Sequence, residues 1–301
     1  MIRTVSFVAL ATCIALSFGA ERATAKEFKV ISQKTVGGFG HIESVAYDRK
    51  EKVFYTSEFG AGDLKPAEKD GKGKILKVSL DGQISDSGIA PPAGETFHKP
   101  KGIWIRGNRM WFTDIDVVWE FDLKSKKGKK LALPVTFAND PAVIKNVLYI
   151  SDNRGDKLVK VEPANFLTSK KEPKITTVFE GKGIGPNGIY PAKNGSLLIV
   201  GFQGKDKPQG IYELPLGQEP KLLSDKIGML DGLYQARNGD IVSTDWVTGS
   251  LFQWNEKMGK KELAADFKGP ADFAVVRNRE GYLVAVPDLV KGEMRLIQLG
   301  R

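Results

Sequence analysis

Cysteine and histidine are almost absent from this sequence. The 301 residues contain one cysteine, Cys13, and two histidines, His41 and His98. A single cysteine cannot form a disulfide within the chain, and zinc or haem centres built from clusters of histidine and cysteine are excluded. The sequence also lacks a Gly-x-Ser-x-Gly nucleophile elbow and a phosphate-cradling Gly-Lys-Ser/Thr loop, which excludes the enzyme classes that depend on those motifs.

Long apolar runs are equally scarce, and the one that exists lies at the N-terminus. Arg3 precedes an apolar segment, residues 5–20, and Ala23-Thr24-Ala25 supplies the small-x-small pattern of a signal-peptidase site. We therefore expect residues 1–25, Cys13 included, to be a cleaved signal peptide that directs the protein to the periplasm or the extracellular space. The apolar run is shorter than the roughly 20 residues that a membrane span needs, and no later run replaces it, so we expect no membrane span.

The charge is basic, with 45 Lys and Arg against 36 Asp and Glu, a net charge of +9. Lysines concentrate in turn-like segments, residues 124–130 and 257–261, which is typical of a solvated surface. Together with the export signal, this distribution argues against a nucleic-acid partner. A net charge of this size also discourages self-association, and we expect a monomer.

Helical periodicity is missing, and short apolar strands separated by turns take its place. The clearest unit runs from Asn187-Gly188-Ile189-Tyr190 through the turn at residues 193–195 to the apolar run 197–200. The same pattern returns from Asp231 through the turn at residues 237–239 to residues 240–243. Asn-Gly between two apolar runs is a strong β-hairpin signal.

Four further copies of this unit begin near residues 43, 101, 140 and 272. With 187 and 231 as the remaining markers, the spacings are 58, 39, 47, 44 and 41 residues. Blades of roughly 40 to 50 residues with four short strands indicate a β-propeller. The sequence therefore predicts an all-β, six-bladed β-propeller with four-stranded antiparallel blades, in which residues 26–301 form a single domain.

The number of strands also predicts how the ring closes. The last copy offers only three strands, at residues 274–277, 282–286 and 294–299, whereas an unassigned strand, Phe28–Ser32, precedes the first copy. Pairing this N-terminal strand with Met294–Leu299 completes the last blade and removes two exposed sheet edges.

The first residues of the inner strands should form a ring at one mouth of the central channel. These residues are Glu43, Lys101, Asp140, Asn187, Asp231 and Asp272. Carboxylates that lie so close together need a cation to remain ionised, and oxygen ligands suit Ca²⁺ best, with Mg²⁺ or Mn²⁺ as alternatives. A second interpretation remains for Asn187-Gly188 and Asp231-Gly232, because Asx-Gly pairs also form turns.

These motifs resemble the six-bladed propellers of the gluconolactonase, regucalcin and strictosidine-synthase-like family. The resemblance implies that Glu43, Asn187 and Asp231 are the metal ligands, and that Asp231 also acts as the general base. Asp140 and Asp272 would then stand beside the ion without binding it directly. The implied activity is the hydrolysis of a small lactone or ester by metal-activated water at the channel mouth.

One part of the family pattern is missing. The family's substrate clamp contains an arginine and an asparagine, whereas this chain reads His98-Lys99-Pro100-Lys101-Gly102. Lys101 either neutralises Asp140 or Asp272 or receives an anionic substrate. An alternative function therefore stays open, in which the propeller binds a ligand or a partner protein without catalysis and the ion is structural.

His41 and His98 precede the inner strands of neighbouring blades. They either face one another over the ion as acid and base or are ordinary loop residues. The longest insertion, residues 59–73, is either a lid over the mouth or a surface loop.

Overall fold

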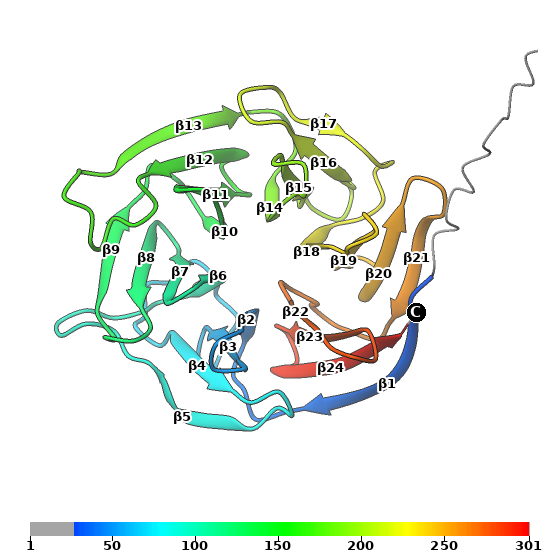
Figure 1. The fold of residues 1–301 in the computed structure, drawn as a ribbon, viewed down its shortest axis with the longest axis horizontal. Coiled ribbons are helices and arrows are strands. Elements are labelled where there is room, and N and C mark those ends of the chain that lie inside the picture. Colours follow the sequence, from blue (N-terminus) through cyan, green and yellow to red (C-terminus); the bar gives the residue numbers. More distant parts are fainter. Residues whose placement is uncertain (1–26, 301) are drawn as a thin grey trace, which may run out of the picture.

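The computed structural model describes residues 27–300, so the predicted signal peptide, residues 1–25 with Cys13, lies outside the described residues. The strands form six four-stranded antiparallel sheets arranged around a central axis, which confirms the predicted six-bladed propeller (Figure 1). Within residues 27–300 no helix is long and apolar enough to cross a membrane. From its inner to its outer strand, the first blade consists of β2 (Ile42–Asp48), β3 (Val53–Glu58), β4 (Lys74–Val78) and β5 (Ile84–Ile89), the second of β6 (Pro100–Arg106), β7 (Arg109–Asp114), β8 (Val117–Asp122) and β9 (Gly128–Ala132), and the third of β10 (Ala138–Ile144), β11 (Val147–Asp152), β12 (Lys157–Glu162) and β13 (Lys174–Glu180). In the same order, the fourth blade consists of β14 (Pro186–Pro191), β15 (Leu197–Gly201), β16 (Ile211–Leu214) and β17 (Lys221–Leu222), the fifth of β18 (Leu230–Gln235), β19 (Ile241–Asp245), β20 (Ser250–Asn255) and β21 (Gly259–Ala264), and the sixth of β22 (Ala274–Arg277), β23 (Tyr282–Asp288), β24 (Glu293–Gly300) and β1 (Lys29–Val36).

The hydrophobic core is divided among the interfaces between neighbouring blades. Between the first and second blades, for example, Phe97 packs edge-on against Phe112 and Trp119 at centroid distances of 5.0 and 5.2 Å. Comparable clusters lie at the five other interfaces. Because each blade is covered on both faces by its neighbours, all six interfaces are shielded from solvent only when the ring is closed.

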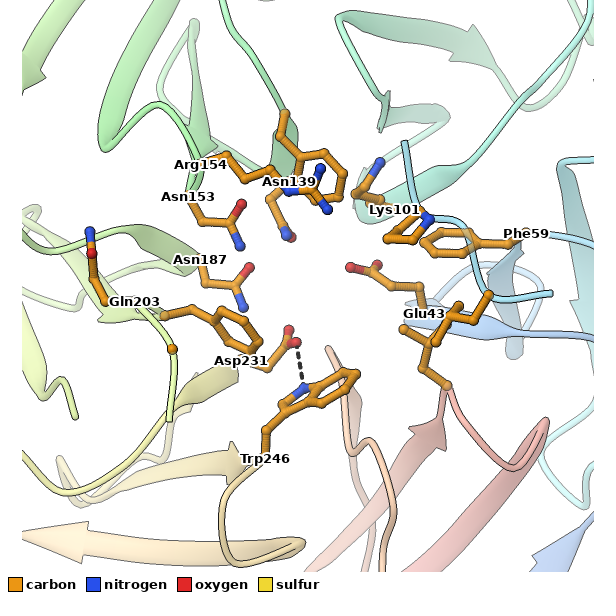
Figure 2. A pocket seen from close by; sticks show the side chains of 16 residues that line it. Glu43, Phe59, Lys101, Asn139, Asn153, Arg154, Asn187, Gln203, Asp231 and Trp246 are labelled. Atoms are coloured by element: carbon orange, nitrogen blue, oxygen red, sulfur yellow. Dashed lines mark hydrogen bonds between the residues drawn. The ribbon is translucent and has the colours of Figure 1, made fainter. Parts of the chain in front are cut away.

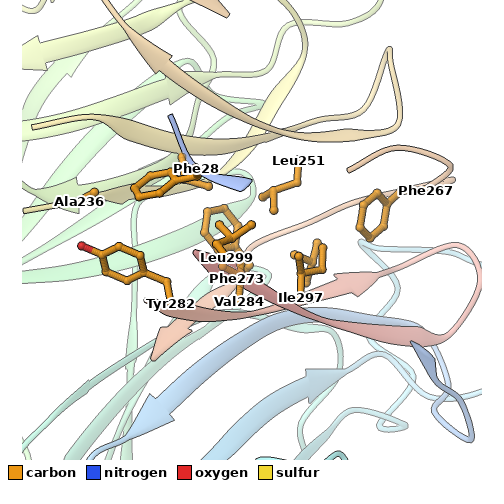
Figure 3. Packing of buried hydrophobic residues seen from close by; sticks show 11 residues of the cluster. Phe28, Ala236, Leu251, Phe267, Phe273, Tyr282, Val284, Ile297 and Leu299 are labelled. Atoms are coloured by element: carbon orange, nitrogen blue, oxygen red, sulfur yellow. The ribbon is translucent and has the colours of Figure 1, made fainter. Parts of the chain in front are cut away.

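The N-terminal strand closes the ring as predicted. Strand β1 pairs antiparallel with β24, with Val30 opposite Leu299 and Val36 opposite Met294, and it extends four residues beyond the predicted end. Just before it, Phe28 is buried at the interface of the fifth and sixth blades, 5.4 Å from the Tyr282 ring (Figure 3). The Phe28 backbone N–H donates to Gln253 Oε1 at 2.9 Å.

Buried carboxylates anchor the loops that lead into the inner strands. In five blades the second strand ends on an acidic residue that accepts backbone N–H groups from the incoming loop. Asp114, for instance, accepts from the N–H groups of His98 at 2.8 Å and Lys99 at 2.7 Å. These bonds fix where each inner strand begins, and so they fix the side chains at the channel mouth. The five residues are Glu58, Asp114, Asp152, Asp245 and Asp288.

Candidate functional site

The strand register defines one ring of side chains at the channel mouth. Most inner strands carry a bulge just after their first residue, as between Ile42 and Ser44 or between Ala138 and Pro141. In five blades, the side chain of the residue after this first position points into a common cavity of about 570 Å³. These five residues are Glu43, Lys101, Asn139, Asn187 and Asp231.

Asp140 and Asp272 are not members of this ring, which corrects the sequence-based alignment of the third and sixth blades. Asn139 and Ala271 stand at the equivalent positions, since Ala138 pairs with Asp152 and Pro270 bridges to Asp288 as the first residues do elsewhere. One position further along, Asp140 accepts from the Ile189 N–H at 2.8 Å and Asp272 accepts from Ser44 Oγ at 2.7 Å. Both line a second cavity at the other end of the inner strands, about 400 Å³ in volume.

The Asx-Gly pairs are parts of strands, not turns. Asn187-Gly188 lies within β14 and Asp231-Gly232 within β18. Glycine is required at Gly188 because a Cβ atom there would stand 2.0 Å from the Asp231 carbonyl oxygen. The close approach of neighbouring inner strands, and not turn geometry, therefore explains this glycine and leaves the Asn187 and Asp231 side chains facing the channel.

A second ring of side chains surrounds the first and was missed by the sequence analysis. In five blades the residue directly after the second strand lines the same cavity. A recurring acidic residue at the end of that strand could have revealed this position. The five residues are Phe59, Asn153, Phe202, Trp246 and Leu289. They surround the polar ring with a largely aromatic and aliphatic wall.

Three ring oxygens are buried without a hydrogen-bond partner. They belong to the three predicted metal ligands: Glu43 Oε2, Asn187 Oδ1 and Asp231 Oδ1. Figure 2 shows these side chains pointing toward the same space from three blades. Buried polar atoms are normally hydrogen-bonded, so three such acceptors facing one cavity are placed to bind a partner within it. Asn153 Oδ1 is a fourth oxygen of this kind.

Neighbouring groups orient two of these oxygens. Trp246 Nε1 donates to Asp231 Oδ2 at 2.9 Å, which leaves Oδ1 facing the cavity (Figure 2). Asn187 Nδ2 donates to the Leu230 carbonyl oxygen at 3.2 Å, which turns Oδ1 inward. Within residues 27–300 no group of three or more His, Cys, Asp or Glu side chains is arranged to hold a metal. The donor set here instead combines two carboxylates with amide oxygens, a mixture that suits a hard cation such as Ca²⁺.

Burial disfavours the charged form of both ring carboxylates. It raises the pKa of Asp231 to about 7, with the negative charge of Asp272 adding to the effect and the Trp246 hydrogen bond opposing it. Burial also raises the pKa of Glu43 well above its usual range, and Asp231 adds to this shift. A cation between these carboxylates would oppose both shifts, because a neighbouring positive charge favours the ionised form.

The structure does not bring the two histidines together over the mouth. Neither residue lines the cavity, so of the two alternatives the arrangement matches loop residues and not an acid and base pair. His41 contacts the carbonyl oxygens of Gly62 and Leu289 through Nε2 and Nδ1, and His98 Nδ1 accepts from the Gly71 N–H at 3.0 Å. Both histidines therefore hold the 59–73 segment, whose residues Leu64 and Pro66 form part of the cavity wall.

Replacing His98 with glutamine is expected to leave divalent-cation binding unchanged, because His98 contacts the 59–73 segment and no ring residue. The measurement is the rise in melting temperature on adding Ca²⁺, compared between the wild type and His98→Gln. A rise that disappears in the variant would return His98 to the site.

Known structures share this architecture at low sequence identity. The sequence matches no protein-family model and no curated protein. Among solved structures, a calcium-binding protein, regucalcin, from Agrobacterium tumefaciens aligns at 12% identity and a TM-score of 0.60, covering 88% of this chain and 95% of that one. A gluconolactonase from Xanthomonas campestris aligns at 10% identity and a TM-score of 0.64, covering 90% and 91%.

The chain shares its fold with gluconolactonases and regucalcin. It is also similar to virginiamycin B lyase from Staphylococcus aureus, at 13% identity and a TM-score of 0.59, covering 90% of this chain and 99% of that one. Identities this low establish a common fold, and propellers host many functions. The function must therefore be argued from the residues at the mouth.

Proposed function

We propose that this chain binds one divalent cation at the channel mouth, through Glu43, Asn187 and Asp231, and hydrolyses a small lactone or ester there. The observation that carries the proposal is the set of three buried oxygens without hydrogen-bond partners around one cavity. Ca²⁺ is the expected ion, with Mg²⁺ or Mn²⁺ as alternatives. The calcium-binding and gluconolactonase neighbours support the same assignment.

The residues divide the chemistry between them. A bound cation would polarise the substrate carbonyl and lower the pKa of a water molecule. Asp231 would hold the cation through Oδ1, and its other oxygen, Oδ2, which Trp246 Nε1 holds in position, is left to accept a proton from the attacking water. The aromatic side chains of Phe59, Phe202 and Trp246 exclude bulk water from the apolar part of the substrate.

The test is an assay of a lactone and ester panel that includes glucono-δ-lactone and phenyl acetate. Wild-type protein and Asp231→Asn are compared with Ca²⁺ and with EDTA. We expect hydrolysis by the wild type with Ca²⁺, and loss of activity with EDTA and in the variant. Hydrolysis that survives in both would contradict the proposal.

A non-catalytic function is the second candidate, and two observations favour it. Neither histidine reaches the cavity, and the segment 98–102 lacks the family's arginine and asparagine. In that case the ion stabilises the ring of side chains at the channel mouth, and the cavity binds a small ligand or a partner protein. Cation binding without hydrolysis of any panel member would favour this candidate. In either case we propose a protein exported to the periplasm or beyond by residues 1–25.

The raised carboxylate pKa values predict that cation binding depends on pH. The pKa of Asp231 is about 7 in the folded chain against an ordinary value of 3.8, so the cation competes with a proton below pH 7. We expect Ca²⁺ affinity to fall about tenfold per pH unit below 7 for each proton displaced.

Without the cation, the same shift makes the folded state bind this proton more tightly than the unfolded state does. The stabilisation that proton binding by Asp231 gives the folded state is complete below the pKa of the unfolded chain, 3.8, and is lost as the pH rises toward 7. Thermal unfolding in EDTA and in Ca²⁺ between pH 5 and 8 measures both effects. A Ca²⁺-induced stabilisation that does not grow with pH would contradict them.

A further inference from the structure

Lys101 is a buried cation without a carboxylate partner. Its side chain is in the ring at the mouth and the residue is 1% exposed. Nζ donates to the Lys99 carbonyl oxygen at 3.0 Å, and within residues 27–300 no carboxylate oxygen lies within 4.0 Å of it. An ammonium group has three N–H donors, so only one of the three is satisfied by the protein. Lys101 therefore does not neutralise Asp140 or Asp272 by direct pairing.

A second cation shares the aromatic ring against which Lys101 lies. Lys101 Nζ is 4.1 Å from the centroid of Phe137, and the Arg154 guanidinium carbon is 3.9 Å from the same centroid. Arg154 is exposed at the rim, comes from the loop after β11, and forms no ion pair with any residue in 27–300. Figure 2 shows its side chain reaching toward the centre of the cavity. Phe137 thus holds one cation at the rim and one deeper in the mouth.

With a divalent cation bound, the ionised Glu43 and Asp231 contribute two negative charges, and Lys101 and Arg154 contribute two positive charges. Without the cation, burial raises the pKa of both carboxylates and so reduces their negative charge. A divalent cation between Glu43, Asn187 and Asp231 leaves an excess of two positive charges in a partly buried space. Such a site favours a ligand that brings negative charge of its own.

We propose that Lys101 and Arg154 form an oxyanion subsite, so that the substrate is a small lactone or ester that also carries a carboxylate or phosphate group. That the substrate is a lactone or ester rests on the proposed function. The binding of an anion by Lys101 and Arg154 does not depend on it. Arginine and lysine donate charge-assisted hydrogen bonds to both kinds of oxyanion. The aromatic wall of Phe59, Phe202 and Trp246 would contact the apolar part of the same molecule.

Binding of benzoate and of phenyl phosphate tests the subsite without any reaction. Titration calorimetry, with the intrinsic tryptophan fluorescence as a second readout, compares the wild type with Lys101→Met and Arg154→Met. We expect each substitution to weaken binding at least tenfold, both with Ca²⁺ and with EDTA, while Ca²⁺ binding is retained. Arg154→Lys should recover part of the affinity. Lys205→Met is the control, because Lys205 is an exposed cation beside the cavity-lining residue Gly204.

The outcomes separate this inference from the proposed function. Anion binding that depends on Lys101 and Arg154, without hydrolysis of any ester, would support the subsite and count against the hydrolase. Hydrolysis of phenyl acetate and 4-acetoxybenzoate with equal efficiency would overturn the subsite and leave the hydrolase standing. Benzoate binding that requires Ca²⁺ and ignores both substitutions would also overturn it, because the carboxylate would then be bound to the ion. The relative strength of benzoate and phenyl phosphate identifies which oxyanion the subsite prefers.

Discussion

Asp231→Asn is expected to abolish the stabilisation of this protein by Ca²⁺. Trp246 Nε1 donates to one oxygen of Asp231, so in the variant it holds the amide oxygen and turns the amide NH₂ toward the cation. A hydrogen-bond donor then replaces an anionic ligand. In the wild type, Ca²⁺ at a hundredfold excess over Kd should add about 2.7 kcal/mol to the free energy of unfolding. This corresponds to a rise in melting temperature of roughly 5 °C for a chain of this size.

The control for this experiment is Asp225→Asn. Asp225 is exposed on the segment that leads into β18, so the substitution changes the net charge equally without touching the ring. We expect differential scanning fluorimetry to show the full Ca²⁺-induced rise for the wild type and Asp225→Asn and none for Asp231→Asn. Equal rises in all three proteins would place the cation elsewhere.

Removal of residues 27–36 is expected to prevent formation of the closed ring. The deletion exposes β24, an eight-residue strand, as an open sheet edge, and it takes Phe28 out of the interface between the fifth and sixth blades. Exposed edges of this length pair with other chains. We expect the truncated protein to aggregate, measured by light scattering and by size-exclusion chromatography. A soluble monomer with unchanged cooperative unfolding would show that the closure is dispensable.

A point substitution isolates the packing contribution of the N-terminal segment. Phe28 is 2% exposed and Ile31, on the adjoining strand, is 58% exposed. Phe28→Ala should lower the free energy of unfolding by about 3–5 kcal/mol, whereas Ile31→Ala should change it by less than about 0.5 kcal/mol. Denaturant unfolding of both variants provides the comparison.

The sequence was sufficient to predict the blades and their closure because the signals are local. The Asn-Gly turns at Gly195 and Gly239 have the positive φ angles, 86° and 95°, that glycine accommodates. Each turn fixes one hairpin, and six hairpins of similar spacing fix the ring. The unassigned strand at the N-terminus could then be assigned to the sixth blade, which otherwise had only three strands.

The ring at the mouth was predicted in part because a bulge separates the first residue of an inner strand from the rest. Glu43, Asn187 and Asp231 were placed correctly, since a recognisable residue marks that position in their blades. In the third and sixth blades the nearest acidic residues, Asp140 and Asp272, stand one position too far along. A bulge changes the direction in which a side chain points, and the local amino-acid sequence does not reveal it. The sequence therefore offered no reason to choose Asn139.

Contacts that form only when a blade folds, between a loop and a neighbouring strand or loop, were missed. Trp246 follows β19, and its indole holds a carboxylate oxygen of Asp231 on the neighbouring strand β18. Arg154 and Phe137 come from different loops and meet only after the third blade has folded. No sequence spacing encodes such meetings. For the histidines the sequence left two alternatives open, because proximity in sequence to the inner strands does not decide whether a side chain reaches the cavity.

The central claim is that one divalent cation binds Glu43, Asn187 and Asp231 at the channel mouth. A crystal structure of the protein grown with Ca²⁺, or with Mn²⁺ for a stronger anomalous signal, tests it most directly. We expect a single anomalous peak in the cavity, with oxygens of these three side chains roughly 2.3–2.6 Å from a bound Ca²⁺. An ordered water molecule or the Lys101 ammonium group at that position in saturating Ca²⁺ would contradict it.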